Sequence, residues 1–183
     1  VIADDTMTAD SAYRLAAEGT ALLWRSDFQN ARQLLQALMR RIDRPRKVRR
    51  KPEAADPAPG AAFHRHRQAQ AQRAHTLSML LIPVEADYAI PLRLAPDVRL
   101  ACTEAWGAGT EPSVVSLREL LGLIGAHEWR KKGVDVPALG AHIHPHYGVF
   151  APIRSEYVKL VAAATLPAQT LAFDIGTGTG VLA

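Results

Sequence analysis

The sequence predicts a mostly helical chain whose last part holds the first elements of an α/β domain. Alanine, leucine and arginine dominate the composition, and apolar residues recur at helical spacing over much of residues 1–133. Near the end, the apolar residues 170–175 run into alternating glycines, a pattern typical of a buried strand that enters a ligand-binding turn. We therefore expect a helical substrate-recognition domain over residues 1–133 and a second domain over residues 134–183.

The composition limits the class of protein. With 183 residues and 48% apolar content, most of the chain is expected to fold. The single cysteine, Cys102, excludes an internal disulfide framework and a cysteine-based zinc site, and we expect it to be a small core residue. No apolar run approaches the ~18 residues of a membrane helix, and residues 1–10 lack the pattern of a signal peptide. We expect a cytoplasmic protein with no membrane segment.

The first elements are expected to be helices. Residues 9–41 predict two packed helices broken near residues 25–27, with Leu22 on the first and Phe28 on the second. This αα-hairpin resembles one tetratricopeptide-type helix pair, but such units need about three stacked copies, and no second copy is present. An ordinary packed hairpin is therefore the simpler prediction.

The middle of the chain alternates an expected linker with further helices. Residues 44–60 combine prolines with repelling positive charges, which predicts an exposed and poorly ordered linker. A third helix is expected over residues 61–81 and a short one over residues 96–106. Ser116 and Glu119 form a candidate capping box for a helix that Gly133 closes.

The last part of the chain has a different composition. Prolines and glycines recur through residues 134–152, which predicts irregular structure. A helix is expected over residues 156–164, followed by the strand at residues 170–175.

The positive charge is concentrated in one region. Residues 40–75 hold eleven Lys or Arg against three acids, although the net charge of the whole chain is only +4. A solvated charge run explains such a segment, and so does a surface that docks RNA or an acidic protein. The candidate docking residues are Arg46, Lys47, Arg49, Arg50, Arg65 and Arg67.

The glycines form the pattern Asp174-x-Gly176-x-Gly178-x-Gly180. Glycine lets the backbone approach a ligand closely and adopt positive φ. A dinucleotide fingerprint would need glycine where Val181 stands, and a phosphate-binding P-loop would need a lysine after the glycines. The sequence therefore disfavours a dinucleotide-binding site and a P-loop, and it also disfavours a nucleotide-dependent oxidoreductase.

The segment AFDIGTGTG at residues 172–180 resembles motif I of the class I S-adenosylmethionine-dependent methyltransferases. The segment YGVFAPIRSEYV at residues 147–158 resembles the stretch before motif I in the glutamine-N5 and amino-directed nucleic-acid methyltransferases. The resemblance implies a Rossmann-like α/β domain and S-adenosylmethionine as cofactor. It implies that Phe150 and Pro152 shape the wall of the cofactor pocket. The floor of the pocket would be formed by Asp174, Gly176, Gly178 and Gly180.

The resemblance covers about a fifth of the chain, and the elements that follow motif I in this family have no counterpart in these residues. The missing elements include the acid that binds the ribose hydroxyls and the polar-Pro-Pro-aromatic loop that holds the reacting amine. We therefore expect the amino-terminal portion of a longer enzyme, with no methyl transfer by these 183 residues alone and no assignable catalytic residue.

Other candidate sites are weaker. His142, His144 and His146 alternate along the chain, but Pro145 interrupts strand geometry and no acid or cysteine nearby completes a metal site. We expect structural or substrate-facing roles for them and no metal. His127 and Glu128 lack the second histidine of a zinc-protease motif.

The main hypothesis is thus a methyltransferase acting on RNA or a translation-related protein. The alternative is a noncatalytic helical adaptor that binds nucleic acid or protein through its basic segment. The methyl acceptor and the oligomeric state do not follow from the sequence.

Overall fold

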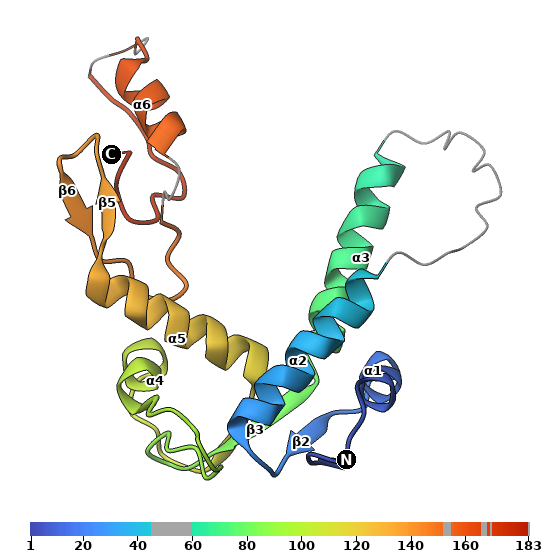
Figure 1. Ribbon diagram of the computed structural model, residues 1–183. Helices are drawn as coiled ribbons and strands as arrows, with labels where there is room; N and C mark the ends of the chain where they lie inside the picture. Colours follow the sequence, from blue (N-terminus) through green and yellow to red (C-terminus); the bar gives the residue numbers. More distant parts are fainter. Residues whose placement is uncertain (45–59, 152–154, 166–167, 169, 183) are drawn as a thin grey trace. The chain divides into compact units, whose positions relative to one another are not determined.

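The computed structural model describes residues 1–44, 60–151, 155–165, 168 and 170–182. The described residues contain six helices and six strands in chain order: β1 (Ile2–Ala3), α1 (Ala9–Ala17), β2 (Leu22–Trp24), α2 (Phe28–Asp43), α3 (Ala61–Ser78), β3 (Leu80–Val84), α4 (Arg99–Trp106), β4 (Ser113–Ser116), α5 (Leu117–Lys132), β5 (Val134–Val136), β6 (Ala141–Ile143) and α6 (Ser155–Ala163) (Figure 1). Helices take about 47% of these residues and strands 12%. The chain is therefore mixed α/β. Helix exceeds strand, as expected, but the small mixed sheet within residues 1–133 was not predicted.

The chain divides into two compact units. The first comprises residues 1–99 and 108–121, and the second comprises residues 100–107 and 122–183. The division therefore falls within α5 and not at residue 133, where the sequence pattern changes.

The first unit is built on a four-stranded sheet in the order β1-β2-β3-β4. The first three strands are parallel and β4 is antiparallel to β3. Leu22 of β2 stands opposite Leu80 of β3, and both are fully buried. Helices α1, α2 and α3 contact one another, as expected when successive right-handed crossovers place their helices on the same face of a sheet.

The predicted αα-hairpin over residues 9–41 is absent, because a strand separates its two helices. Gly19, with φ of 86°, follows the end of α1, and Leu22–Trp24 then pairs with strands on both sides. A similar correction applies to the third helix, which ends at Ser78, so that Leu80 and Leu81 belong to β3. The sequence of a short apolar run is compatible with a helix or a strand. Both of these runs form strands because neighbouring strands pair with them.

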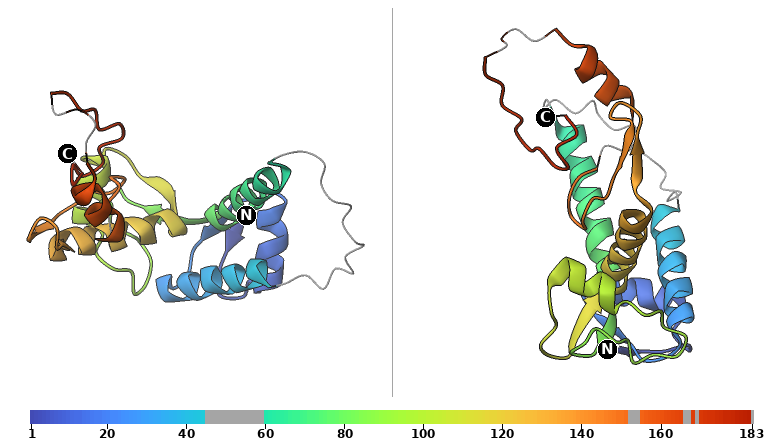
Figure 2. Two further views of the ribbon diagram at one scale, coloured as in Figure 1. Left: turned by 90° about the horizontal axis from the view of Figure 1, so that it is seen from above. Right: turned by 90° about the vertical axis from the view of Figure 1, so that its left-hand side faces the viewer.

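The later helices agree closely with the predicted ranges. The predictions of helices at residues 96–106, after Ser116 and at 156–164 correspond to α4, α5 and α6. Gly133, with φ of 80°, ends α5 as expected, and the β5–β6 hairpin follows directly (Figure 2). None of the helices in the described part of the chain combines the length and apolar character that crossing a lipid bilayer requires.

The strand predicted at residues 170–175 is not formed in the described residues of that segment. Leu171, Phe173 and Ile175 are 66%, 81% and 95% exposed, so one side of the segment presents apolar groups to solvent. A strand requires a neighbour to satisfy its backbone groups, and no described strand pairs with this segment. The apolar alternation is present, but the pairing that would make it a strand is not.

Candidate cofactor-binding site

The glycine-rich segment forms two successive turns. Gly176, Gly178 and Gly180 have φ values of 84°, 56° and 74°, all in the left-handed region that side chains disfavour. The Thr177 hydroxyl donates to the main-chain oxygen of Asp174 at 3.1 Å, and the Gly180 amide donates to the Thr177 carbonyl at 2.9 Å. The alternating glycines are therefore required by the backbone path.

The structure brings Phe150 against this turn. A Cβ atom added to Gly178 would lie 2.9 Å from the main-chain oxygen of Phe150 and 3.6 Å from its Cβ. Only a residue without a side chain allows the two backbone segments to approach so closely. Phe150 and Gly178 were assigned to one pocket from two separate motifs. Although they are 28 positions apart in sequence, they lie within contact distance.

A small apolar cluster holds the end of the turn. Val181 is 9% exposed and packs with Val136 of β5 and Val158 of α6. Tyr157 packs against the same cluster, and its hydroxyl is buried without a hydrogen-bond partner among the residues that the structure describes. An unpaired buried hydroxyl usually has a partner that the protein alone does not supply, such as a water or a ligand.

The remaining predicted residues are open to a ligand. A Cβ atom at Gly176 or Gly180 would meet no atom of the described residues within 4 Å, and the Phe150 side chain is 70% exposed. Asp174 is exposed, and its carboxylate makes no hydrogen bond or ion pair with any residue that the structure describes. Pro152 lies outside the described residues. The turn therefore exposes two glycines, an aromatic ring and a carboxylate to solvent.

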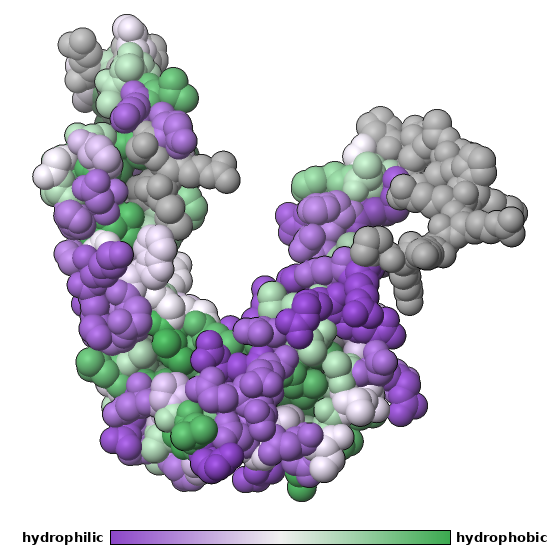
Figure 3. Space-filling model, in the orientation of Figure 1, coloured by the Kyte–Doolittle hydropathy of each residue, from purple (hydrophilic) through white to green (hydrophobic). Residues whose placement is uncertain are grey.

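The basic residues divide between described and undescribed segments. Arg46, Lys47, Arg49 and Arg50 lie outside the described residues. Arg65 and Arg67 lie on the exposed first half of α3, and the Arg67 guanidinium is 5.8 Å from the centre of the Phe63 ring. Hydrophilic residues cover much of the visible surface of α2 and α3 (Figure 3). The helix α3 contains no acidic residue of its own, and Arg73 near its end pairs with Asp43 of α2 at 2.9 Å.

Two of the three alternate histidines, His142 and His144, lie close to the end of α5. His144 Nδ1 lies 2.6 Å from the main-chain oxygen of Arg130. A Cβ atom on Gly133 would lie 2.9 Å from the His144 ring and 3.1 Å from Cβ of His142. Within the described residues, no group of three potential metal-ligating side chains gathers here or elsewhere.

A cluster that the sequence did not indicate joins α4 to α5. The Glu104 carboxylate of α4 accepts hydrogen bonds from two residues of α5. The distances are 2.9 Å to His127 Nδ1 and 2.8 Å to Arg130 Nη1. The hydrogen bond from His127, with that from Arg130, holds the pKa of the Glu104 carboxyl below its usual value. Positions 104 and 127 are 23 residues apart, so no local motif could have revealed the pair.

Cys102 is fully buried, as predicted, and burial raises the pKa of its thiol to about 11. At neutral pH the thiol is protonated and poorly nucleophilic.

No model of a known family, no curated protein and no solved structure matches this chain. The functional argument therefore depends on the geometry of the glycine turn and the residues around it.

Proposed function

We propose that the chain carries the cofactor-binding turn of a class I S-adenosylmethionine-dependent methyltransferase that acts on RNA or on a translation-related protein. One observation carries the proposal. The motif Asp174-x-Gly176-x-Gly178-x-Gly180 adopts left-handed turns, and Gly178 lies against the backbone of Phe150. A generic glycine turn would not need a second motif residue packed against it.

In this proposal each group has a distinct task. The glycines keep side chains away from the ligand, so that main-chain atoms can contact it. The Phe150 ring supplies an apolar wall, and Pro152 would extend that wall. The Asp174 carboxylate accepts a hydrogen bond from an amino or hydroxyl group of the cofactor. The methyl group, already bonded to a positively charged sulfur, is supplied by the cofactor itself.

Such a reaction needs no protein nucleophile. The task of the protein is to align the acceptor with the methyl group for in-line attack. This agrees with a site that offers an open turn, an aromatic ring and one carboxylate.

Isothermal titration of the full-length protein with S-adenosylmethionine tests the proposal. Gly178→Ala places a methyl group 2.9 Å from the Phe150 oxygen and leaves alanine at φ of 56°, so we expect binding at least about tenfold weaker. Gly125→Ala is the matched control, because its Cβ points into open space within α5. Equal heats for both variants, or no heat with the parent protein, would refute the assignment.

The noncatalytic adaptor remains a second candidate because of α3. Its first half is exposed, basic and without an acidic residue, as suits binding to an acidic partner. RNA binding by a protein that gives no heat with S-adenosylmethionine would favour the adaptor. Cofactor binding that depends on Gly178 would exclude it.

A further inference from the structure

A groove in the first unit lies at the carboxyl ends of two parallel strands. It has a volume of about 450 Å³, and its lining includes Asp5, which follows β1, and Trp24, which ends β2. One side of α2 forms a wall with Asn30, Gln33 and Arg40. In open α/β sheets, ligands bind in the crevice outside the carboxyl ends of parallel strands.

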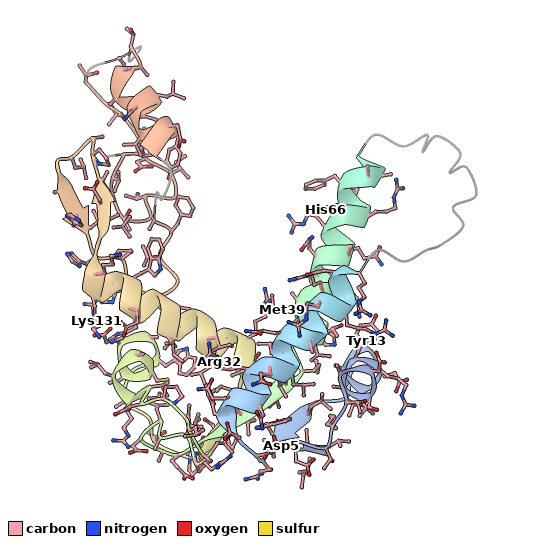
Figure 4. All side chains as sticks on the ribbon, in the orientation of Figure 1. Asp5, Tyr13, Arg32, Met39, His66 and Lys131 are labelled. Atoms are coloured by element: carbon pink, nitrogen blue, oxygen red, sulfur yellow. The ribbon has the colours of Figure 1, made fainter. Side chains whose placement is uncertain are left out.

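One end of the groove offers neutral and acidic hydrogen-bonding groups. The Asp5 carboxylate accepts hydrogen bonds from Asn30 Nδ2 at 2.9 Å and from the Ser26 hydroxyl. These bonds hold Asp5 at the carboxyl end of β2 (Figure 4). Gln33, one turn further along α2, is exposed. Two amides and a carboxylate provide both donors and acceptors, as the edge of a nucleobase requires.

The other end is cationic. A second hollow of about 300 Å³ shares Arg40 with the groove and continues to Arg41 and Arg44. Arg41 is paired with Asp10 at 2.6 Å. Arg40 and Arg44, one helical turn apart, are exposed and form no ion pair with any residue that the structure describes. Their charge is available to an anion.

The distance between the two ends suits a small extended molecule. Gln33 and Arg40 are seven residues apart on α2, which corresponds to ~10 Å along the helix axis. The floor between them is apolar, with Trp24 and Leu34 nearly buried beneath the groove. A nucleotide has the same distribution, with a hydrogen-bonding base at one end, an apolar ring face and a negative phosphate at the other.

We propose that this groove binds a nucleotide of single-stranded RNA, with the phosphate at Arg40 and Arg44 and the base edge at Asn30 and Gln33. The proposal rests on the proposed function and selects RNA as its substrate class. An acidic peptide fits less well, because it has no flat ring edge with donors and acceptors to meet the Asn30 and Gln33 amides. A nucleotide combines such an edge with a phosphate that can meet Arg40 and Arg44.

Fluorescence anisotropy of a labelled ten-nucleotide single-stranded RNA with the full-length protein tests the proposal. Arg40→Gln and Arg44→Gln should each weaken binding roughly tenfold. Each should also flatten the dependence of log Kobs on log salt concentration by about 0.7. Arg32→Gln is the control, because it removes an arginine from α2 that lines neither the groove nor the second hollow (Figure 4). Equal affinity of the Arg40, Arg44 and Arg32 variants would overturn the proposal.

Two further measurements separate the alternatives. Gln33→Ala should reduce the preference among ten-nucleotide homopolymers of A, C, G and U, whereas an unchanged preference would overturn the base contact. Polyglutamate that displaces the RNA as well as an unlabelled strand of equal charge would overturn the choice of RNA. Circular dichroism of each variant checks that the fold is retained.

The proposed cofactor site is tested separately in the same variants by titration with S-adenosylmethionine. Cofactor binding with no effect of Arg40 on RNA affinity would overturn the groove and leave the methyltransferase proposal standing. RNA binding that depends on Arg40, without cofactor binding, would support the groove and refute the methyltransferase proposal.

Discussion

Asp27 is the residue whose replacement tests the architecture of the first unit most directly. It caps the amino end of α2, where its carboxylate accepts the Gln29 amide at 2.8 Å. The same carboxylate is 5% exposed and lies 3.0 Å from the Arg93 guanidinium, whose own side chain is mostly in solvent. The main-chain oxygen of Asp27 accepts a hydrogen bond from the Trp24 indole at 2.9 Å. Replacing the Asp27 side chain does not remove this bond directly.

Two replacements of Asp27 separate the cap from the charge. Asp27→Ala removes both, and we expect a loss of about 2 kcal/mol in the free energy of unfolding, about 1 from the cap and up to about 1 from the ion pair. Asp27→Asn keeps an acceptor for the Gln29 amide and removes only the charge, so we expect a loss of about 0.5 to 1 kcal/mol.

Urea denaturation followed by circular dichroism measures these differences, with the slope m expected to stay unchanged. Arg93→Ala is the matched control, because it removes the partner charge and leaves the cap intact. Equal losses for Asp27→Ala and Asp27→Asn would show that the cap contributes nothing and would refute the reasoning.

Three further predictions concern stability. Gly109→Ala should destabilise the first unit by at least about 2 kcal/mol in the same urea assay, because its Cβ would lie 2.2 Å from the Ala86 carbonyl oxygen. Gly122→Ala, with open space in α5, should instead stabilise the second unit by about 0.5 to 1 kcal/mol. The lowered pKa of Glu104 should make the Glu104–His127–Arg130 cluster stabilising above the carboxyl group's ordinary pKa and ineffective once the pH falls below its folded value. Thermal unfolding should therefore show a difference between the parent protein and Glu104→Gln at pH 6 that shrinks as the pH is lowered below the carboxyl group's ordinary pKa, and a difference that grows on acidification would contradict this linkage.

The candidate site was predictable in part because its signals are local. Alternating glycines after an acid indicate a backbone that needs positive φ, and all three glycines have it. The family resemblance assigned Phe150 and Gly178 to one pocket, but their close contact was not predicted, because the spacing of the two residues carries no geometric information. The groove beside α2 had no local signal, since its wall and floor come from β1, β2 and α2 together.

The sequence by itself determined the elements whose stabilising contacts lie within one segment. Helices α2, α4, α5 and α6 follow from 3.6-residue periodicity, since helical hydrogen bonds join residues four apart. The candidate capping box of α5 is not formed, because the Ser116 hydroxyl is buried without a hydrogen-bond partner among the described residues. Only the tertiary structure decided which apolar runs became strands. Leu22–Trp24 pairs with β1 and β3, whereas residues 170–175 pair with none of the described strands. The physical reason is that the hydrogen bonds of a strand belong to its neighbours, whose presence no short segment encodes.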